Sequence, residues 1–415
     1  MKFFENQKSA FQVLAFKDYR YFTIGRFFII FAISIQSVVV GWQVYEATKS
    51  ELQLGLIGLA EAIPFILTSL FGGHIADIIS RKKIVVSSNT IYFICTLLLV
   101  FISYFFKSIF PIYGLMPIFA VIFLTGIARG FLAPAQSAFL AQMVPREKLM
   151  YAATVGSMNF YGANILGTAI GGILCGYLGT YISYSIVSGF TLFGLLIMIF
   201  MVQDFHYERK QTSTSIFKNI YEGIDYVFKS EYLLTALSLD MFAVLFGGAV
   251  AILPAFADKI LHVGPKEFGI LRAAPSVGIV IVLLLLAYFP PKKEAGKKLL
   301  YCVAGFGLAT IAFGFSRNIY LCFFFLMLTG VFDGVSVVIR GSIVPMFSPD
   351  HMRGRIEAVN KIFIGSSNEI GSFESGFAAK LLGLVPSIIF GGGMTMLVVA
   401  ITWWRAKGLR KLDLD

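Results

Sequence analysis

The chain has 415 residues, of which 57% are hydrophobic and 14% are charged, and its mean hydropathy is +0.81. Soluble domains contain about 45–50% apolar and about 25% charged residues, so this composition excludes an ordinary soluble protein and predicts an integral membrane protein. The net charge of +11 is not gathered in one soluble stretch, so we expect it to attract an anionic inner leaflet and not nucleic acid.

Twelve apolar segments follow one another along the chain. Each is long enough to cross a bilayer core of about 30 Å, which needs a helix of about 20 apolar residues. We expect helices because lipid cannot satisfy open sheet edges, and because no alternation with a period of two residues occurs. In chain order the segments cover residues 21–45, 52–76, 84–106, 116–140, 150–178, 182–202, 232–258, 267–289, 298–316, 319–346, 355–384 and 386–404. The predicted fold class is all-α integral membrane, with twelve transmembrane helices in two pseudo-symmetric six-helix bundles.

Lysine and arginine are concentrated on one side of this predicted topology. They gather in the N-terminal segment, in the C-terminal tail and in the loops that share a side with both ends. Because short cytoplasmic loops of membrane proteins are enriched in these residues, both termini are predicted to be cytoplasmic. The N-terminal segment lacks the pattern of a cleaved signal peptide, so we expect the first helix to act as the targeting signal.

A polar stretch, residues 203–231, separates the sixth and seventh segments. Its apolar residues follow the 3.6-residue spacing of an amphipathic helix. They are Ile216, Phe217, Ile220, Tyr221, Ile224, Val227 and Phe228. We expect a cytoplasmic linker with an interfacial helix on the membrane surface, joining an N-terminal bundle (1–202) to a C-terminal bundle (232–415).

A weak internal repeat supports the two bundles. The second segment contains Gly58-x-x-Glu61-x-x-Pro64, and the eighth contains Gly269-x-x-Arg272-x-x-Pro275 at the corresponding place. The opposite charges of Glu61 and Arg272 predict an ion pair that closes the outer mouth. The alternative is that each side chain extends separately to the outer interface.

The loop after the second segment, "GGHIADIISRKK", carries a more diagnostic pattern. Its Arg81 and Lys82 suit a cytoplasmic face, but Asp77 precedes the cations and needs another explanation. We expect Asp77 to face the positively polarised N-terminus of a neighbouring helix and to latch the two bundles together.

This loop resembles the signature of the major facilitator superfamily, which implies a twelve-helix transporter fold. The resemblance rests on Gly73 to Asp77 followed by Arg81 and Lys82. The loop departs from the signature at Ile78, where a basic residue is usual, and at Ser80, where glycine is usual.

Four stretches also resemble the enterobactin-exporter subfamily. They are "GWQVYEATKSELQLGLIGLAEAIP" (41–64), "ARGFLAPAQSAFLAQMVPREKL" (128–149), "FGILRAAPSVG" (268–278) and "NEIGSFESG" (368–376). The resemblance implies a bacterial inner-membrane exporter of siderophores, drugs or other amphiphiles, often driven by proton entry.

The fifth segment contains "GTAIGGILCG", which has two overlapping Gly-x-x-x-Gly spacings. Such spacings allow close helix contact, here at Gly167, Gly171, Gly172 and Gly176. The stretch also resembles the antiporter motif of the superfamily, although Thr168 stands where proline is usual.

Charged residues inside the predicted spans mark the candidate transport site. Each costs roughly 2.5–3.5 kcal/mol at the bilayer centre, so such residues face a cavity or a partner. They are Arg26, Glu61, Arg129, Asp240, Arg272, Asp333, Arg340, Glu369 and Glu374. Mutual charge cancellation is the structural alternative. Asp333 and Arg340 are about 10 Å apart along one helix, so we expect each to pair with a different helix.

The eleventh segment carries two carboxylates on different faces. At 100° per residue, Asn360, Ser367 and Glu374 share a stripe with Asn368 on its flank, and Glu369 falls nearly opposite. One carboxylate is expected to face a central cavity and carry the proton, while the other meets a neighbouring helix. The assignment stays open at this point, as does unwinding of the helix at its glycines.

These patterns predict a secondary active transporter, a proton-coupled exporter of an amphiphilic small molecule. A lipid or lysolipid flippase and a non-transporting membrane sensor are the alternatives, and sodium is the alternative coupling ion. No hydrolase or metalloprotease motif and no phosphate-binding loop occurs, so we expect no enzyme and no cofactor. The scattered cysteines and histidines predict no metal site. The expected partners are the substrate, the ion and membrane lipids, with the protein a monomer.

Overall fold

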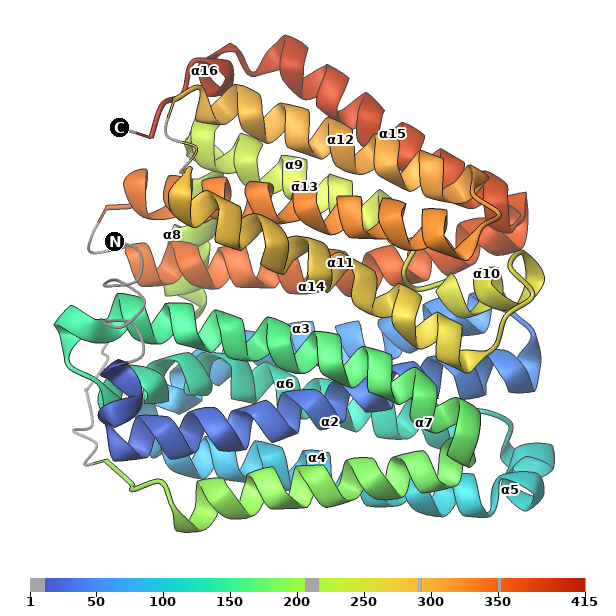
Figure 1. Cartoon of the computed structure of the whole chain (residues 1–415). Coiled ribbons are helices and arrows are strands. Elements are labelled where there is room, and N and C mark those ends of the chain that lie inside the picture. The colour runs from blue at the N-terminus through green and yellow to red at the C-terminus, as the bar shows by residue number, and fades with distance from the viewer. Residues whose placement is uncertain (1–11, 206–215, 290, 292, 350–351, 415) are drawn as a thin grey trace. The chain divides into compact units, whose positions relative to one another are not determined.

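The computed structural model describes residues 12–205, 216–289, 291, 293–349 and 352–414. Its regular elements within these ranges are all helices (Figure 1). Nine of the described helices are long and apolar enough to cross a membrane. The protein is therefore an all-helical, multi-pass integral membrane protein, as its composition predicts.

The helices group into two compact units. One unit comprises residues 1–44 and 63–212, and the other comprises residues 45–62 and 213–415. The first unit contains most of α2 (Lys17–Thr48), the second part of α3 (Glu51–Ile78) and the following helices to α7. These are α4 (Arg81–Tyr104), α5 (Phe106–Tyr113), α6 (Met116–Met143) and α7 (Leu149–Phe200).

The second unit contains the remaining helices and the C-terminal tail. They are α8 (Ile216–Lys229), α9 (Glu231–Phe246), α10 (Leu253–Lys259), α11 (Pro265–Tyr288), α12 (Ala295–Phe315), α13 (Ile319–Met346), α14 (Arg353–Leu382), α15 (Leu384–Arg405) and α16 (Lys407–Arg410). Within it, α11 packs along α13, and α12 packs against both α13 and α15 (Figure 1).

Glycine and proline set the helix boundaries near three of the predicted spans. The predicted spans 150–178 and 182–202 are two helices within the range of α7, and they are separated at Gly179, whose backbone is non-helical with a positive φ of 75°. The predicted span 232–258 is divided, because α9 ends at Gly247 and Pro254 lies in the first turn of α10. Glycine ends helices readily, and proline is favoured at a helix start.

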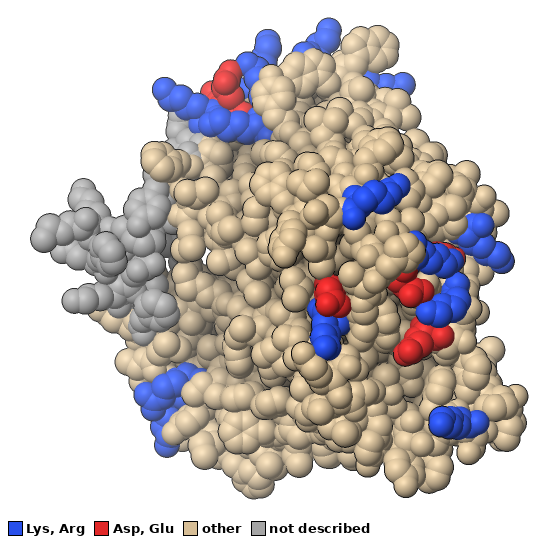
Figure 2. All heavy atoms as spheres, turned by 45° about the vertical axis from the view of Figure 1, so that its right-hand side comes forward, with Lys and Arg blue, Asp and Glu red and all other residues tan. Residues whose placement is uncertain are grey.

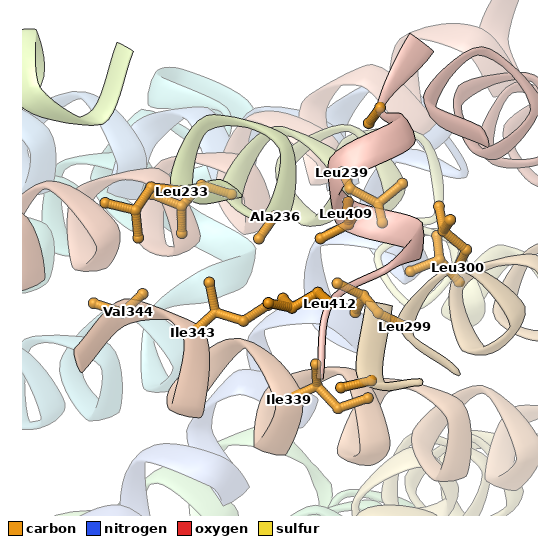
Figure 3. Packing of buried hydrophobic residues seen from close by; sticks show 14 of the residues in the cluster. Leu233, Ala236, Leu239, Leu299, Leu300, Ile339, Ile343, Val344, Leu409 and Leu412 are labelled. Carbon is orange, nitrogen blue, oxygen red and sulfur yellow. The ribbon is translucent and has the colours of Figure 1, made fainter. Parts of the chain in front are cut away.

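The core of the second unit lies where α9, α12, α13 and the C-terminal tail meet. Leu233, Leu299 and Ile343 are fully buried there, together with Leu409 of α16 (Figure 3). The tail is tied to α12 by the backbone N–H of Gly296, which donates to the carbonyl of Leu412 over 3.2 Å. A side chain at Gly296 would overlap the Leu409 backbone, so this glycine permits the close approach.

The first unit has a separate core between α2, α4, α6 and α7. Phe22 and Phe139 meet edge to face at 5.7 Å between their ring centroids, and both are buried. The Tyr19 hydroxyl donates to the Ala152 carbonyl over 2.9 Å, which joins α2 to α7. The surface outside these cores is largely uncharged in the view of Figure 2 and carries many exposed large hydrophobic side chains, as expected for contact with lipid.

Candidate functional site

A buried charge cluster joins α9 and α13 in the second unit. The Arg340 guanidinium forms an ion pair with Asp240, and both side chains are buried, at 7% and 6% exposure. Its Nη2 atom also lies 3.7 Å from Oδ1 of Asp333, which is 33% exposed. Its Nε atom donates to the Ser336 hydroxyl over 3.1 Å.

The contact between Arg340 and Asp333 corrects the expectation that the two are too far apart to pair. A helical side chain leaves its Cα towards the helix N-terminus. The long arginine therefore reaches back along α13 to Asp333, seven residues earlier. Arg340 therefore contacts Asp240 on α9 and Asp333 on its own helix, α13, at the same time.

The cluster is unbalanced in charge. With both aspartates ionised, Asp240 and Asp333 carry two negative charges against the single positive charge of Arg340. A cavity of about 10 Å³ lies beside it, close to the space that one water molecule needs, and Asp240, Asp333, Ser336 and Cys302 contribute to its lining. An uncompensated buried charge is costly. Binding one proton to either aspartate would remove the excess negative charge of the cluster.

The two carboxylates of the eleventh predicted span lie on one unbroken helix, α14. Glu369 lies close enough to Arg272 of α11 for the two charges to interact. Gly58 of α3 packs on the same turn, since a Cβ there would lie 2.7 Å from the Glu369 carbonyl oxygen. Glu369 thus meets a neighbouring helix, and the Glu61–Arg272 pair stays a prediction.

Glu374 occupies a different environment on α14. Its half-buried carboxyl lies near the hydroxyl of the adjacent Ser375. Ser367, one of the residues on its predicted stripe, is buried, and Asn360 is half-buried. Asn368 is exposed and donates to the Ile364 carbonyl of its own helix over 2.8 Å.

A set of ionic contacts that the sequence analysis missed ties the α2–α3 turn to α10. Lys49 pairs with Asp258 at 3.0 Å, and Lys259 pairs with Glu51 at 2.5 Å. The Tyr45 hydroxyl donates to Asp258 over 2.8 Å. The charge pattern gave a signal, because adjacent opposite charges at 258–259 match opposite charges at 49 and 51.

The cations of the loop motif stabilise the first unit. Arg81 donates to the Ala138 carbonyl near the end of α6 over 3.1 Å. Lys82 donates to the carbonyls of Ile199 and Val202, at 3.0 and 2.6 Å, at the end of α7. Cations at helix C-termini are favoured by the helix dipole and by unpaired carbonyls. The side chain of Asp77 and the surroundings of Gly73 lie outside the described residues.

The other intramembrane residues of the first unit lie at helix contacts. The Arg129 guanidinium stands over the Phe65 ring, 4.9 Å from its centroid. Gly167 packs on the α2 backbone, since a Cβ there would lie 2.6 Å from the Phe31 carbonyl oxygen, and Gly171 meets Ile35 in the same way. Arg26 faces Gly156 of α7.

Cysteine and metal chemistry play no visible part in the described residues. The four cysteines are free. Within the same ranges no group of three His, Cys, Asp or Glu side chains is placed to hold a metal ion.

Comparison with known sequences matches nearly the whole chain to one family of proteins. The family model described as transmembrane secretion effector, of the major facilitator type, matches residues 8–414. The uncharacterised major facilitator transporter YfmI of Bacillus subtilis is 22% identical over 386 residues, covering 89% of this chain and 91% of the relative. The enterobactin exporter EntS of Shigella flexneri is 25% identical over 341 residues, covering 81% and 78% of the two chains.

Solved structures share the same fold. A peptide-transporter (POT) family structure with bound 5-aminolevulinic acid superposes with a TM-score of 0.73 at 13% identity, covering 94% of this chain and 96% of that one. A bacterial homologue of the human lysosomal transporter Spinster superposes with a TM-score of 0.70 at 14% identity, covering 95% and 96%.

Proposed function

The chain belongs to the transmembrane secretion effector family of the major facilitator superfamily, and from that membership we propose that it is a proton-coupled exporter of an amphiphilic small molecule. The relatives and structural neighbours are membrane transporters and not enzymes. The similarity to enterobactin exporters supports a siderophore or drug-like substrate and a place in the bacterial inner membrane.

The unbalanced Asp240–Arg340–Asp333 cluster is the observation that carries this proposal. Protonation of one aspartate leaves one carboxylate opposite one guanidinium, which is neutral overall. Deprotonation leaves a net negative charge in a site where Asp240 and Arg340 are buried. A group of this kind binds and releases a proton when its solvation changes, which is what alternating access requires of a coupling site.

The two α14 carboxylates have separate roles in this proposal. Glu369 holds Arg272 and acts in the conformational change. Glu374, whose electrostatic surroundings include no cation among the described residues, is the second candidate for the proton. One proton moving down about 100 mV supplies about 2.3 kcal/mol, enough for a substrate gradient of tens-fold.

The test uses the full-length protein in proteoliposomes with an imposed pH gradient and an acidic lumen. Enterobactin, erythromycin and a lysophospholipid serve as separate probes, and uptake is measured over time. We expect the wild type to accumulate at least one probe by about tens-fold and to collapse that gradient when a protonophore is added. A sodium gradient in place of the pH gradient tests the alternative ion.

Asp333→Asn and Glu374→Gln distinguish the two proton candidates. The variant at the coupling site should lose pH-driven accumulation but keep exchange of labelled for unlabelled probe, which needs no net driving force. Asp225→Asn, the same chemical change on exposed α8, is the matched control and should behave as wild type. Undiminished coupling in both test variants and in Asp240→Asn would refute the proposal.

A further inference from the structure

Arg26 of α2 contrasts with Arg340 and Arg272, two arginines of the spans that have acidic neighbours. Arg340 pairs with two aspartates, and Arg272 interacts with Glu369. Among the residues that the structure describes, none with a carboxylate pairs with Arg26. Its electrostatic neighbour is the phenol of Tyr19, which is un-ionised at neutral pH.

The surroundings of Arg26 also leave hydrogen-bonding groups unused. Its Nε atom is buried and has no hydrogen-bond partner. The Oδ1 atom of Asn159 is likewise buried and without a partner, while its Nδ2 atom donates to the Thr23 carbonyl over 2.9 Å. Buried polar groups in proteins are nearly always satisfied, so these two atoms at one helix contact are able to bind a polar group of a ligand.

The helices hold these groups on two facing strips. Tyr19, Thr23 and Arg26 follow one another at helical spacing on α2, and Ala152, Gly156 and Asn159 do so on α7. The Tyr19–Ala152 and Asn159–Thr23 hydrogen bonds fix the two strips against each other.

Gly156 allows the guanidinium to lie close to α7. A Cβ at this position would lie 3.3 Å from Nη1 of Arg26, so any larger side chain would press on the charged group. The residues that flank Gly156 on the next face of α7, Ala153 and Ser157, are small and exposed. The side chains beside the guanidinium on this face of α7 are therefore short.

We propose that Arg26 and Asn159 form a subsite for the acidic group of the transported amphiphile, a carboxylate, phosphate or catecholate. An isolated cation in a span needs a counter-charge, and a mobile anion supplies it only when substrate is bound. Arginine is suited to this role because its planar donors match oxyanions, and Asn159 would accept from a hydroxyl of the same ligand. This inference rests on the proposed function, since it names the substrate class of that exporter.

Binding to the full-length protein in nanodiscs tests the subsite without a pH gradient. The probes are 11-(dansylamino)undecanoic acid and its methyl ester, which differ in one charge and whose fluorescence rises in apolar surroundings. Empty nanodiscs give the lipid background. At a pH of about 8, where the acid is ionised, we expect the acid to bind about tenfold more tightly than the ester, as for a charge-assisted hydrogen bond.

Arg26→Gln should reduce that preference to about one and leave the affinity for the ester unchanged. Asn159→Asp should do the same by placing an internal carboxylate on the adjacent turn, and it keeps the arginine in place if the glutamine variant folds poorly. Arg26→Lys should retain part of the preference. Lys107→Gln, which removes one exposed positive charge in α5 of the same unit, should retain all of it.

Three results would overturn the subsite. The first is that the wild type binds neither probe, or binds the acid and the ester equally well. The second is that the Arg26→Gln protein still prefers the acid. The third is that this variant loses affinity for the acid and the ester equally. The binding assay uses no pH gradient, so its result does not depend on proton coupling. The proposal of a proton-coupled exporter and the proposal of a subsite at Arg26 can therefore be refuted independently.

Discussion

At the scale of single residues, long side chains explain what the sequence could and could not predict. The spacing of Asp333 and Arg340 correctly marks two charges on one helix, yet it suggested that they could not meet. The arginine stem reaches back along α13 and brings the head group to 3.7 Å from Asp333. Spacing gives the positions of Cα atoms, whereas the reach of a flexible side chain depends on which neighbours attract it.

Gly58 offers a test of close packing at a single residue. A Cβ at Gly58 would lie 2.7 Å from both the Glu369 carbonyl oxygen and the Ser372 Cβ of α14. We expect Gly58→Val to destabilise this contact by about 1–3 kcal/mol, the usual effect of overpacking. The measurement is the thermal unfolding midpoint of the purified protein.

Gly162→Ala is the matched control for this experiment. A Cβ at Gly162 on α7 meets nothing within 4 Å. Alanine in place of a helical glycine should stabilise α7 by about 0.5–1 kcal/mol, so the two substitutions should shift the midpoint in opposite directions. Equal shifts would show that the approach of α3 to α14 does not depend on Gly58.

At the scale of elements, glycine residues determine where the helices of the predicted spans end, and ionic side chains connect the α2–α3 turn to α10. Gly179 and the Gly247–Gly248 pair were visible in the sequence, but a glycine alone does not reveal whether a helix passes through it or ends there, as helices do at Gly179 and at Gly247. The contacts of the α2–α3 turn with α10 were not predicted, because the matching charges at 49, 51, 258 and 259 lie more than 200 residues apart and many other pairings are equally consistent with the sequence.

The Lys49–Asp258 pair should contribute little stability and should respond to salt. The side chains are 55% and 37% exposed, and exposed ion pairs are typically worth about 0–1 kcal/mol. A double-mutant cycle with Lys49→Gln and Asp258→Asn should give a coupling free energy in that range, smaller at about 1 M salt, where the Debye length is about 3 Å. A coupling that is unchanged by salt would show that the pair is shielded from solvent.

At the scale of the whole molecule, composition alone predicted the class of protein, and the loop and span motifs predicted the family to which the chain belongs. The grouping of helices was harder to predict. Residues 45–62 cluster with the C-terminal helices, since Gly55 and Gly58 approach α14 and since Lys49 and Glu51 pair with α10. The order of the segments along the chain places residues 45–62 in the N-terminal bundle. Their contacts with α10 and α14 become visible only in the three-dimensional structure.

The distribution of Lys and Arg predicts the orientation of the whole molecule. Both termini are expected on the cytoplasmic side because the positively charged loops share a side with them. The C-terminal segment from Arg405 to Lys411 carries four cations among seven residues, so this end is expected on the cytoplasmic side. A green fluorescent protein fused after Asp415 should fluoresce in bacterial cells, whereas alkaline phosphatase at the same place should be inactive. Fusions after Tyr113, in the loop predicted to be external, should show the reverse, and the same result at both sites would contradict the topology.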